Sequence, residues 1–392
     1  MATADSDAVA VFWDEALLSY DLGDHPLDPV RLELTVELAR SLGVLDRPNV
    51  TVCPPRLADD EALLRVHQPD YISAVKAASG DPFYVGAGLG TPDNPVFDDM
   101  HEASALVAGA TLQAAELVWS GRARRAVNIA GGLHHAMPDR AAGFCVYNDP
   151  AVAIARLLEL GAERIAYLDL DVHHGDGVQH MFYNDPRVLT ISLHQNPLSL
   201  FPGTGFPDET GGPDAEGTAV NLALPPGTTD GQWLTAFHAV VPELLRAYRP
   251  ELLFTQCGAD AHRLDPLAEL WLSVDGQRAS YLAARALADE LCGGRWVATG
   301  GGGYALIDVV PRAWTHLLAV ATGQALEPSL ATPVEWQQLV RERFGQAPPH
   351  RLTDEASVEH QPWQPSEAES DPVARAILAT RRAVFPAHGL RP

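Results

Sequence analysis

The strongest constraint on the fold is a regular alternation of short apolar segments with longer amphipathic segments. It predicts strands at 126–130, 164–170, 187–193, 218–224, 251–256 and 295–299, and helices at 101–120, 150–160, 230–247, 277–291 and 305–321. Gly121 and Gly161 end two of these helices. Because strands that alternate with helices pair in parallel and are covered on both faces, the pattern predicts an α/β fold with a mostly parallel sheet.

One earlier segment fits two structures. Leu34, Leu38 and Leu42 recur every four residues, as on one face of a helix that ends at Gly43. Alternate residues from Val30 to Leu38 are also apolar, as in a strand. The interleaved glutamates favour the helix, because glutamate is a good helix former.

The chain is expected to form one domain and a tail. Its 392 residues would allow two average domains, but single α/β domains also reach this size. Polar motifs follow several different predicted strands, which argues for one catalytic domain over residues 1–345. Residues 346–392 are rich in proline, glutamine and acidic side chains, so we expect a tail packed on the surface of that domain.

Composition excludes several classes of partner. The net charge of −24 disfavours nucleic acid, which requires clustered Lys and Arg. No Lys or Arg precedes Arg31, which disfavours an ordinary signal peptide, and no apolar run reaches the ~18 residues of a transmembrane helix. The four cysteines lack C-x-x-C spacing, so reduced, buried thiols are expected. A cytoplasmic protein without nucleic-acid or membrane partners is predicted.

A dense group of ionisable side chains follows the strand predicted at 164–170. Residues 169–177 read Asp-Leu-Asp-Val-His-His-Gly-Asp-Gly, so Asp169, Asp171 and His173 should face one side as the strand ends. A solvated strand end is the simpler interpretation, but few loops concentrate such groups without a cation. Carboxylate and imidazole suit a catalytic zinc or another divalent ion. Asp260, directly after another predicted strand, could supply the third ligand, although alone it would indicate a turn or helix cap.

Two adjacent histidines follow a third strand. His134 and His135 come after a pair of glycines, where one could act as a base on metal-bound water and the other as an acid towards a leaving amine. Each ring would need a partner to fix its tautomer, and Asp169 and Asp176 are available. A polar loop or an additional metal ligand are the alternatives.

Four glycines precede a tyrosine after the last predicted strand. Gly300–Gly303 would allow the side chain of Tyr304 to reach into a pocket, where a phenol could stabilise an oxyanion. The segment also fits the dinucleotide-binding fingerprint G-x-G-x-x-A. We reject that interpretation because the next helix leads into the tail rather than to a second parallel strand.

Together these motifs resemble the zinc-dependent histone deacetylase superfamily, most closely its bacterial branch of acetoin-utilisation-type deacetylases. The similarity covers about residues 9–325. It is carried, in the family's order, by residues 131–135, 143–149, 169–177, 201–205, 258–260 and 300–304. The resemblance implies an arginase-like three-layer fold, in which helices flank an eight-stranded, mostly parallel sheet.

The resemblance also implies roles for individual residues. One catalytic Zn²⁺ would be bound by Asp171, His173 and Asp260. His134, paired with Asp169, and His135, paired with Asp176, would manage the water and the protons, and Tyr304 would polarise the carbonyl. A narrow substrate tunnel would involve Gly143, Phe144, Phe201, Leu267 near its mouth and Asp93 at its rim. Structural K⁺ would lie beside Asp169, Asp171, His173 and Ser192, with a second ion near Phe182, and Arg31 would line an acetate channel.

The implied reaction is zinc-dependent hydrolysis of the acetyl-lysine amide of proteins, which releases acetate and free lysine. An acetyl-CoA synthetase is the family-based candidate substrate, and the oligomeric state stays open. The leading alternative is an acetylpolyamine amidohydrolase. Such enzymes carry an acidic residue at the tunnel mouth, where this chain has Leu267.

Two alternatives come from other classes. Binuclear-manganese ureohydrolases carry a motif of the form D-x-H-x-D. In this chain the third carboxylate, Asp176, comes one residue too late to complete that motif. An inactive binding module would be expected to lack Tyr304 or one of the two histidines, and all three are present. One metal ion and amide hydrolysis are therefore favoured.

Overall fold

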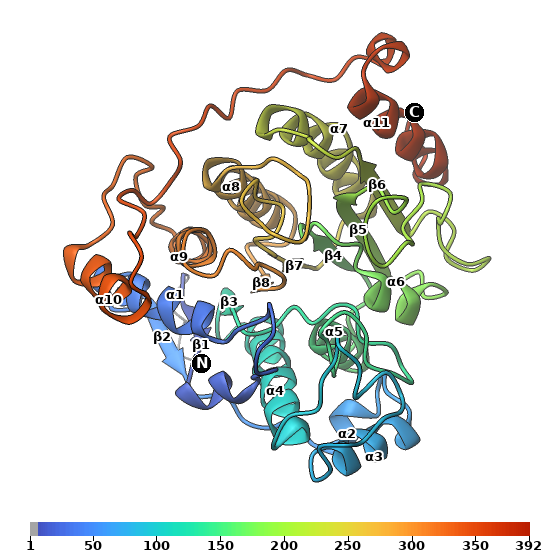
Figure 1. The fold of residues 1–392 in the computed structure, drawn as a ribbon. Coiled ribbons are helices and arrows are strands. Elements are labelled where there is room, and N and C mark those ends of the chain that lie inside the picture. The colour runs from blue at the N-terminus through green and yellow to red at the C-terminus, as the bar shows by residue number, and fades with distance from the viewer. Residues whose placement is uncertain (1–6) are drawn as a thin grey trace.

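A computed structural model describes residues 7–392 and contains one eight-stranded sheet (Figure 1). The strands are β1 (Val9–Phe12), β2 (Val50–Cys53), β3 (Arg125–Asn128), β4 (Ile165–Asp169), β5 (Val188–Gln195), β6 (Ala219–Leu224), β7 (Leu252–Gln256) and β8 (Trp296–Thr299). They lie in the order β2-β1-β3-β8-β7-β4-β5-β6, and all neighbouring pairs are parallel. The predicted eight-stranded α/β architecture is confirmed, with a sheet that is parallel throughout.

Helices cover both faces of the sheet, as its alternating side chains require. Ala166 and Leu168 of β4 pack into one core, whereas Ile165 and Tyr167 pack into a second core on the opposite face. The first core is covered by α1 (Val30–Ser41), α7 (Asp230–Tyr248), α8 (Val274–Leu291) and α9 (Val310–Ala321). The second lies beneath α4 (Met100–Trp119) and α5 (Asp149–Glu159), with α6 (Asp176–Phe182) beside them. The short helices α2 (Asp60–Leu63) and α3 (Pro69–Ala78) lie outside α4 and α5 (Figure 1).

Several elements differ from the sequence-based expectation. The strands β1 and β2 were not predicted, although β3 and β8, which also have four residues each, were. No glycine-rich motif follows β1 or β2 as it follows β3 and β8, and the two central residues of β2 are exposed. The helix predicted at 305–321 begins only at Val310, since the preceding residues form a turn. The ambiguous early segment is helical, as the glutamates indicated. Of the four cysteines, all free thiols, only Cys53 is not buried.

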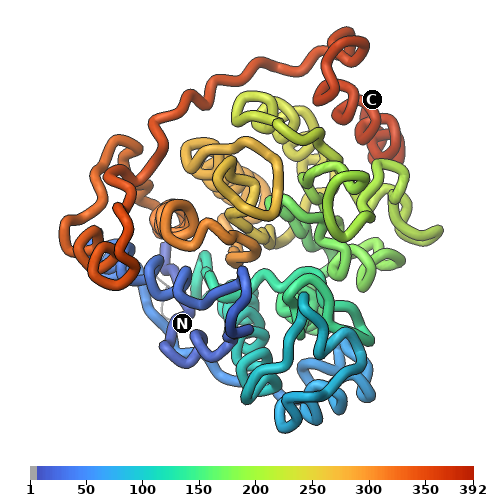
Figure 2. The backbone as a smooth tube through the Cα atoms, in the orientation of Figure 1, coloured from blue at the N-terminus to red at the C-terminus, as the bar shows by residue number. Residues whose placement is uncertain are grey.

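The C-terminal residues run around the outer side of the helices that cover the first core and include a packed helix. Figure 2 shows this segment passing from α10 (Val334–Phe344) to α11 (Pro372–Val384), which contacts β6 and α7. Leu352 and Ile377 are fully buried. The segment therefore adds apolar contacts to the core, while the proposed boundary at residue 345 stays a prediction.

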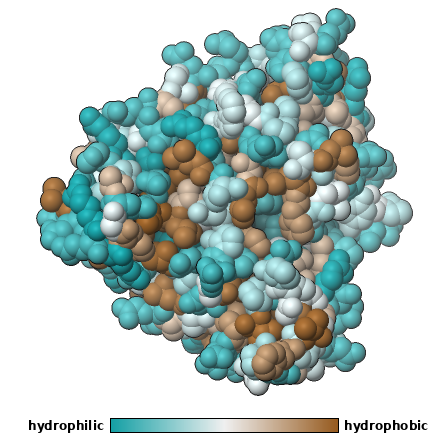
Figure 3. Space-filling model, in the orientation of Figure 1, coloured by the Kyte–Doolittle hydropathy of each residue, from teal (hydrophilic) through white to brown (hydrophobic). Residues whose placement is uncertain are grey.

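The surface is largely hydrophilic at its periphery, with hydrophobic residues gathered towards the centre of the face in Figure 3. Among residues 7–392, Phe83 and Leu198 are the most exposed large apolar side chains, at 88% and 84%. Across residues 7–392, no helix combines the length and apolar character needed to cross a bilayer.

Candidate active site

The carboxyl ends of two adjacent strands bring three ionisable side chains together. Asp171 and His173 follow β4, and Asp260 follows β7, which pairs with β4. Their candidate ligand atoms all lie within 4.8 Å of one another, and all three residues are buried. The Nδ1 atom of His173 is 3.0 Å from Asp171 Oδ1 and 3.1 Å from Asp260 Oδ2. The three predicted metal ligands thus form one compact group.

Glycines leave space for the two carboxylates. A Cβ atom at Gly302 would lie 1.8 Å from Asp260 Oδ2, and one at Gly258 would lie 2.1 Å from Asp171 Oδ2. The backbone N–H of Gly302 also donates to Asp171 Oδ2 at 2.8 Å. The glycine-rich segment after β8 therefore packs directly on the carboxylates. Glycine is needed there because a side chain would clash with them, whether or not the segment is flexible.

The charge balance of this group favours a cation. Burial and the neighbouring Asp171 carboxylate raise the pKa of Asp260 to about 7. Burial disfavours a charged ring at His173, but its hydrogen bonds to both carboxylates raise its pKa to about 10. Two buried carboxylates and one imidazole therefore attract positive charge, and this donor set fits a catalytic zinc with an open position or another divalent ion.

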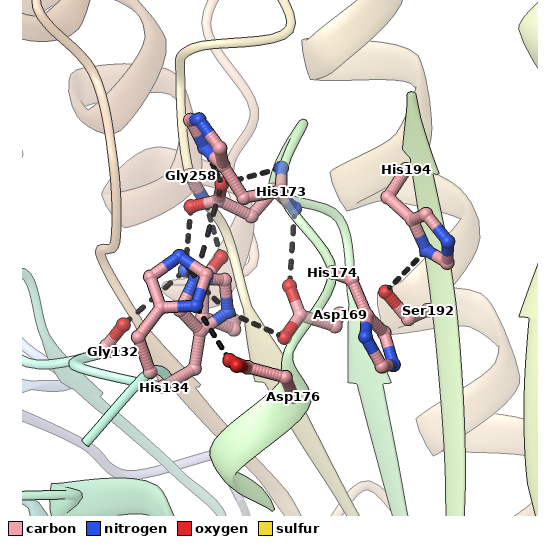
Figure 4. Close-up of polar contacts among 12 residues, drawn as sticks. Gly132, His134, Asp169, His173, His174, Asp176, Ser192, His194 and Gly258 are labelled. Carbon is pink, nitrogen blue, oxygen red and sulfur yellow. Dashed lines mark hydrogen bonds and ion pairs between the residues drawn. The ribbon is translucent and has the colours of Figure 1, made fainter. Parts of the chain in front are cut away.

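The adjacent histidines point towards this group, and each has its own carboxylate. His134 Nδ1 lies 2.8 Å from Asp169 Oδ2 (Figure 4), and His135 Nδ1 lies 2.7 Å from Asp176 Oδ1. The two Nε2 atoms are 3.1 Å apart. When Nδ1–H donates to the carboxylate, Nε2 of the same ring points away from that carboxylate. The structure therefore brings together both predicted histidine–aspartate pairs.

The two rings differ electrostatically although they are neighbours. Burial lowers the affinity of His134 for a proton, but the carboxylates of Asp169 and Asp171 raise its pKa to about 9. Burial and the adjacent His134 lower the pKa of His135. Two neighbouring groups with separated pKa values are typical of acid–base sites.

Two residues that support the histidine loop were not singled out by sequence reasoning. Asn148 Nδ2 donates to the carbonyls of His134 and Ala136 at 3.1 and 3.0 Å. The carboxylate of Asp149 accepts the N–H groups of Gly132 and Leu133. Both residues belong to the 143–149 motif, which was their only signal in the sequence. Their role was not predicted because the loop that they hold lies more than ten residues upstream.

Aromatic side chains surround the histidines and Tyr304. The ring of Phe144 meets that of Tyr304 edge-on at 5.6 Å, and Phe201 meets His135 edge-on at 5.0 Å. A Cβ atom at Gly143 would lie 2.5 Å from His135 Cδ2 and 2.8 Å from Phe201 Cε1, so only glycine fits between them. Tyr304 itself lies in the loop between β8 and α9 and, with Gly143, lines a small cavity beside the candidate metal ligands Asp171 and His173.

Arg31 lies behind the glycine-rich loop. Its side chain is buried and donates to the carbonyls of Gly301 and Gly303 at 2.9 and 3.0 Å. The guanidinium also lies over the ring of Trp314, 5.0 Å from the centroid. The structure therefore places the guanidinium of Arg31 near the cavity that Tyr304 lines. Its role in an acetate channel stays a prediction.

The remaining predicted residues are dispersed. Ser192 pairs in register with Asp169 and bonds through Oγ to His194 Nδ1 (Figure 4). Phe182 instead packs in the core beneath α4 and α5. Asp93 is exposed in a loop, and Leu267 is half-buried after Asp265. The potassium and rim assignments therefore stay predictions.

The fold and the buried group define an α/β protein with a candidate divalent-metal centre at the carboxyl edge of a parallel sheet. Comparison with known families is more specific: residues 25–321 match the Histone deacetylase domain, and the chain belongs to this family. The match includes every candidate site residue from Arg31 to Tyr304. Family membership and the buried group together indicate an enzyme of the deacetylase type.

Individual relatives agree with the branch inferred from the motifs. The chain is 40% identical over 365 residues to Acetoin utilization protein AcuC of Bacillus subtilis (strain 168). The aligned residues cover 91% of this chain and 93% of that protein. It is 36% identical over 332 residues to Acetoin utilization protein AcuC of Staphylococcus aureus (strain MRSA252), with 83% and 85% covered. The predicted resemblance to acetoin-utilisation proteins is confirmed.

Proposed function

We propose that this protein is a metal-dependent protein-lysine deacetylase. The observation that carries the proposal is the arrangement of two carboxylate-paired histidines beside the Asp171–His173–Asp260 group. Amide hydrolysis needs an activated water, a proton donor for the leaving amine and stabilisation of the tetrahedral oxyanion. The site offers a separate group for each of these tasks.

Asp171, His173 and Asp260 would hold one Zn²⁺, with the glycine-lined space around their carboxylates allowing close packing. A divalent ion bound there would act as a Lewis acid towards the amide carbonyl and make water more acidic. The sequence also predicts structural K⁺ next to Asp169 and Ser192, which we retain as part of the proposal.

The protein's own residues would move the protons. His135 Nε2 accepts a proton from the attacking water, while Asp176 holds the opposite nitrogen in its N–H form. Hydroxide adds to the carbonyl carbon, and the phenol of Tyr304 donates to the resulting oxyanion. An imidazolium of the His134–His135 pair gives its proton to the lysine nitrogen as the C–N bond breaks. The products are acetate and free lysine.

The substrate is proposed to be an acetylated protein in the cytoplasm, with an acetyl-CoA synthetase as the candidate. Phe144 and Phe201 would enclose the methylene chain of acyl-lysine, and Arg31 would stabilise departing acetate. Leu267 supports a protein substrate over an acetylpolyamine, because an apolar side chain offers nothing to a second ammonium group.

The test compares substrates on one preparation of known metal content. Purified protein is assayed with a fluorogenic acetyl-lysine peptide and with acetylated polyamines, while zinc and manganese are measured by elemental analysis. We expect one equivalent of zinc, faster turnover of acetyl-lysine, and loss of activity with a chelator. Faster turnover of the polyamine would instead support the acetylpolyamine amidohydrolase. Two equivalents of manganese would support a ureohydrolase.

A further inference from the structure

A carboxylate from the C-terminal segment, whose side chain is 10% exposed, reaches the loop that follows β7 and carries Asp260. The Oδ2 atom of Asp354 lies 2.8 Å from His262 Nε2, and His262 is fully buried two residues after Asp260. Asp354 lies beyond residues 25–321, which match the family domain. The segment outside that match therefore makes direct contact with a loop of the candidate active site.

The contact consists of several hydrogen bonds and an ion pair rather than one hydrogen bond. Asp354 Oδ2 also accepts the N–H of Val274 at 2.9 Å, and Oδ1 pairs with Arg312 at 3.0 Å. In return, Asp275 Oδ2 accepts the backbone N–H groups of Asp354 and Ala356 at 2.9 and 3.1 Å. These reciprocal bonds fix the segment at the N-terminus of α8, where a carboxylate is also favoured by the helix dipole.

His262 transmits this contact to the loop. Its Nδ1 atom accepts the N–H of Leu264 at 3.1 Å, so the ring proton is on Nε2 and is donated to Asp354. The N–H of Asp265 donates to the carbonyl of His262 at 2.9 Å, which completes a tight turn. With both ring nitrogens occupied, the position of the imidazole determines the position of the turn.

The turn formed by residues 262–265 holds the backbone of Tyr304. Asp265 Oδ2 accepts the backbone N–H of Tyr304 at 2.8 Å, and its Oδ1 accepts the N–H of Leu267. Asp354 also reaches the same loop from the other side, because Arg312, in α9, donates to the carbonyl of Asp308. Two routes of hydrogen bonds therefore run from Asp354 to the segment that carries Tyr304.

We propose that Asp354 is a positioning residue, through which the C-terminal segment fixes the orientation of Tyr304 via His262 and Asp265. The inference rests on the proposed role of Tyr304 in amide hydrolysis. Rigid support of this kind is needed because small displacements of a catalytic group lower the rate strongly. Asp354 itself touches no reacting atom.

The first test replaces the carboxylate by Asp354→Asn in the full chain, with Asp371→Asn as a matched control. Asp371 belongs to the same segment and accepts the N–H of Val373 at the start of α11, but it is not part of the contacts to His262. We expect kcat for an acetyl-lysine peptide to fall about tenfold in Asp354→Asn, with KM and zinc content unchanged. Asp371→Asn should keep the kcat of the wild type. An unchanged kcat in Asp354→Asn would overturn the proposal.

A double variant tests whether the effect passes through Tyr304. If Asp354 acts by orienting the phenol, Asp354→Asn should lower kcat by less than about twofold when Tyr304→Phe is already present. A full tenfold loss in that background would contradict the proposed route. Should Asp354→Asn fail to fold, Asp354→Glu keeps the charge but moves the carboxylate by one methylene. It must then give the same pattern with a smaller loss.

Hydrogen exchange separates this inference from the proposed function, because it needs no activity. In the protein as purified, with its bound metal, Asp354→Asn should speed amide exchange in peptides covering 261–267 and 300–306, whereas Asp371→Asn should not. Faster exchange in these peptides, together with a wild-type protein that shows no deacetylase activity in the same metal-loaded preparation, would refute the function but keep the linkage. Unchanged exchange in these peptides, or a uniform increase over the whole chain, would refute the linkage.

Discussion

His135 Nδ1 lies 2.7 Å from Asp176 Oδ1, and this contact joins the histidine loop after β3 to the first residue of α6. The side chain of Asp176 is 10% exposed, so the carboxylate is largely desolvated. A carboxylate in that position selects the Nε2-unprotonated tautomer of His135 and stabilises the ring once it is protonated.

Asp176→Asn should therefore impair catalysis without removing the metal. An amide keeps the size of the side chain but cannot stabilise a protonated ring, and general acid–base catalysis contributes typically 10²–10⁴-fold to rate. We expect kcat to fall on the order of 10²-fold or more, with zinc content unchanged, as measured by steady-state kinetics and elemental analysis. Asp208→Asn, at an exposed position, is the control. Retention of full activity would exclude the proposed pairing.

Tyr304→Phe tests the oxyanion role. The substitution keeps the edge-on contact with Phe144 and removes only the hydroxyl. Loss of one oxyanion donor costs on the order of 10²–10³ in rate, roughly 3–4 kcal/mol. Turnover should fall by that factor while zinc content stays that of the wild type, and wild-type turnover in this variant would rule out the role.

The sequence predicted the centre of the site better than its support. Asp171 and His173 were predictable because a strand ends in a dense polar motif, and local periodicity places both on one side. Asp260 was identified only in the company of the other motifs. Its position next to them depends on β7 lying beside β4, although 82 residues lie between these two strands in the chain.

Residues that support the site through distant contacts were not predictable. Asp354 and Asp265 are acidic residues in loops, and nothing local distinguishes them from the many exposed carboxylates of this acidic chain. The contacts of Asp354 and Asp265 exist only after the chain has folded. The strands β1 and β2 were missed for a different reason: unlike the equally short β3 and β8, neither is followed by a glycine-rich motif that marks the end of a strand.

Gly302→Ala should weaken metal binding in an otherwise folded protein. The added methyl carbon would lie 1.8 Å from Asp260 Oδ2 and 3.0 Å from Asp171 Oδ2, so at least one candidate ligand must move. Gly80→Ala is the matched control, because its methyl group would meet no atom within 4 Å. We expect reduced zinc content after dialysis for Gly302→Ala alone, with circular dichroism unchanged. Equal zinc content in both variants would argue against the assigned ligand set.

A buried histidine outside the metal group should make stability depend on pH. His67 Nδ1–H donates to the carbonyl of Met137, and its Nε2 accepts the N–H of Asn148 at 3.0 Å, which leaves no place for a second proton. Burial lowers the pKa of His67 from 6.5 to about 4. Between these values the unfolded chain binds the extra proton and the folded protein does not. Stability from His67 is therefore complete above about pH 6.5 and is lost as the pH falls towards 4.

The same reasoning predicts how His67→Gln should behave. Each unit of pKa shift corresponds to about 1.4 kcal/mol, so the pH-dependent contribution of His67 is at most on the order of 3 kcal/mol. Urea unfolding at pH 7 should show wild type more stable than His67→Gln, and this difference should shrink by pH 4.5. His350→Gln, at an exposed position, should differ from wild type equally at both pH values. If the gap for His67→Gln were also constant, protonation of His67 would not be linked to folding, and its hydrogen bonds would matter only as structure.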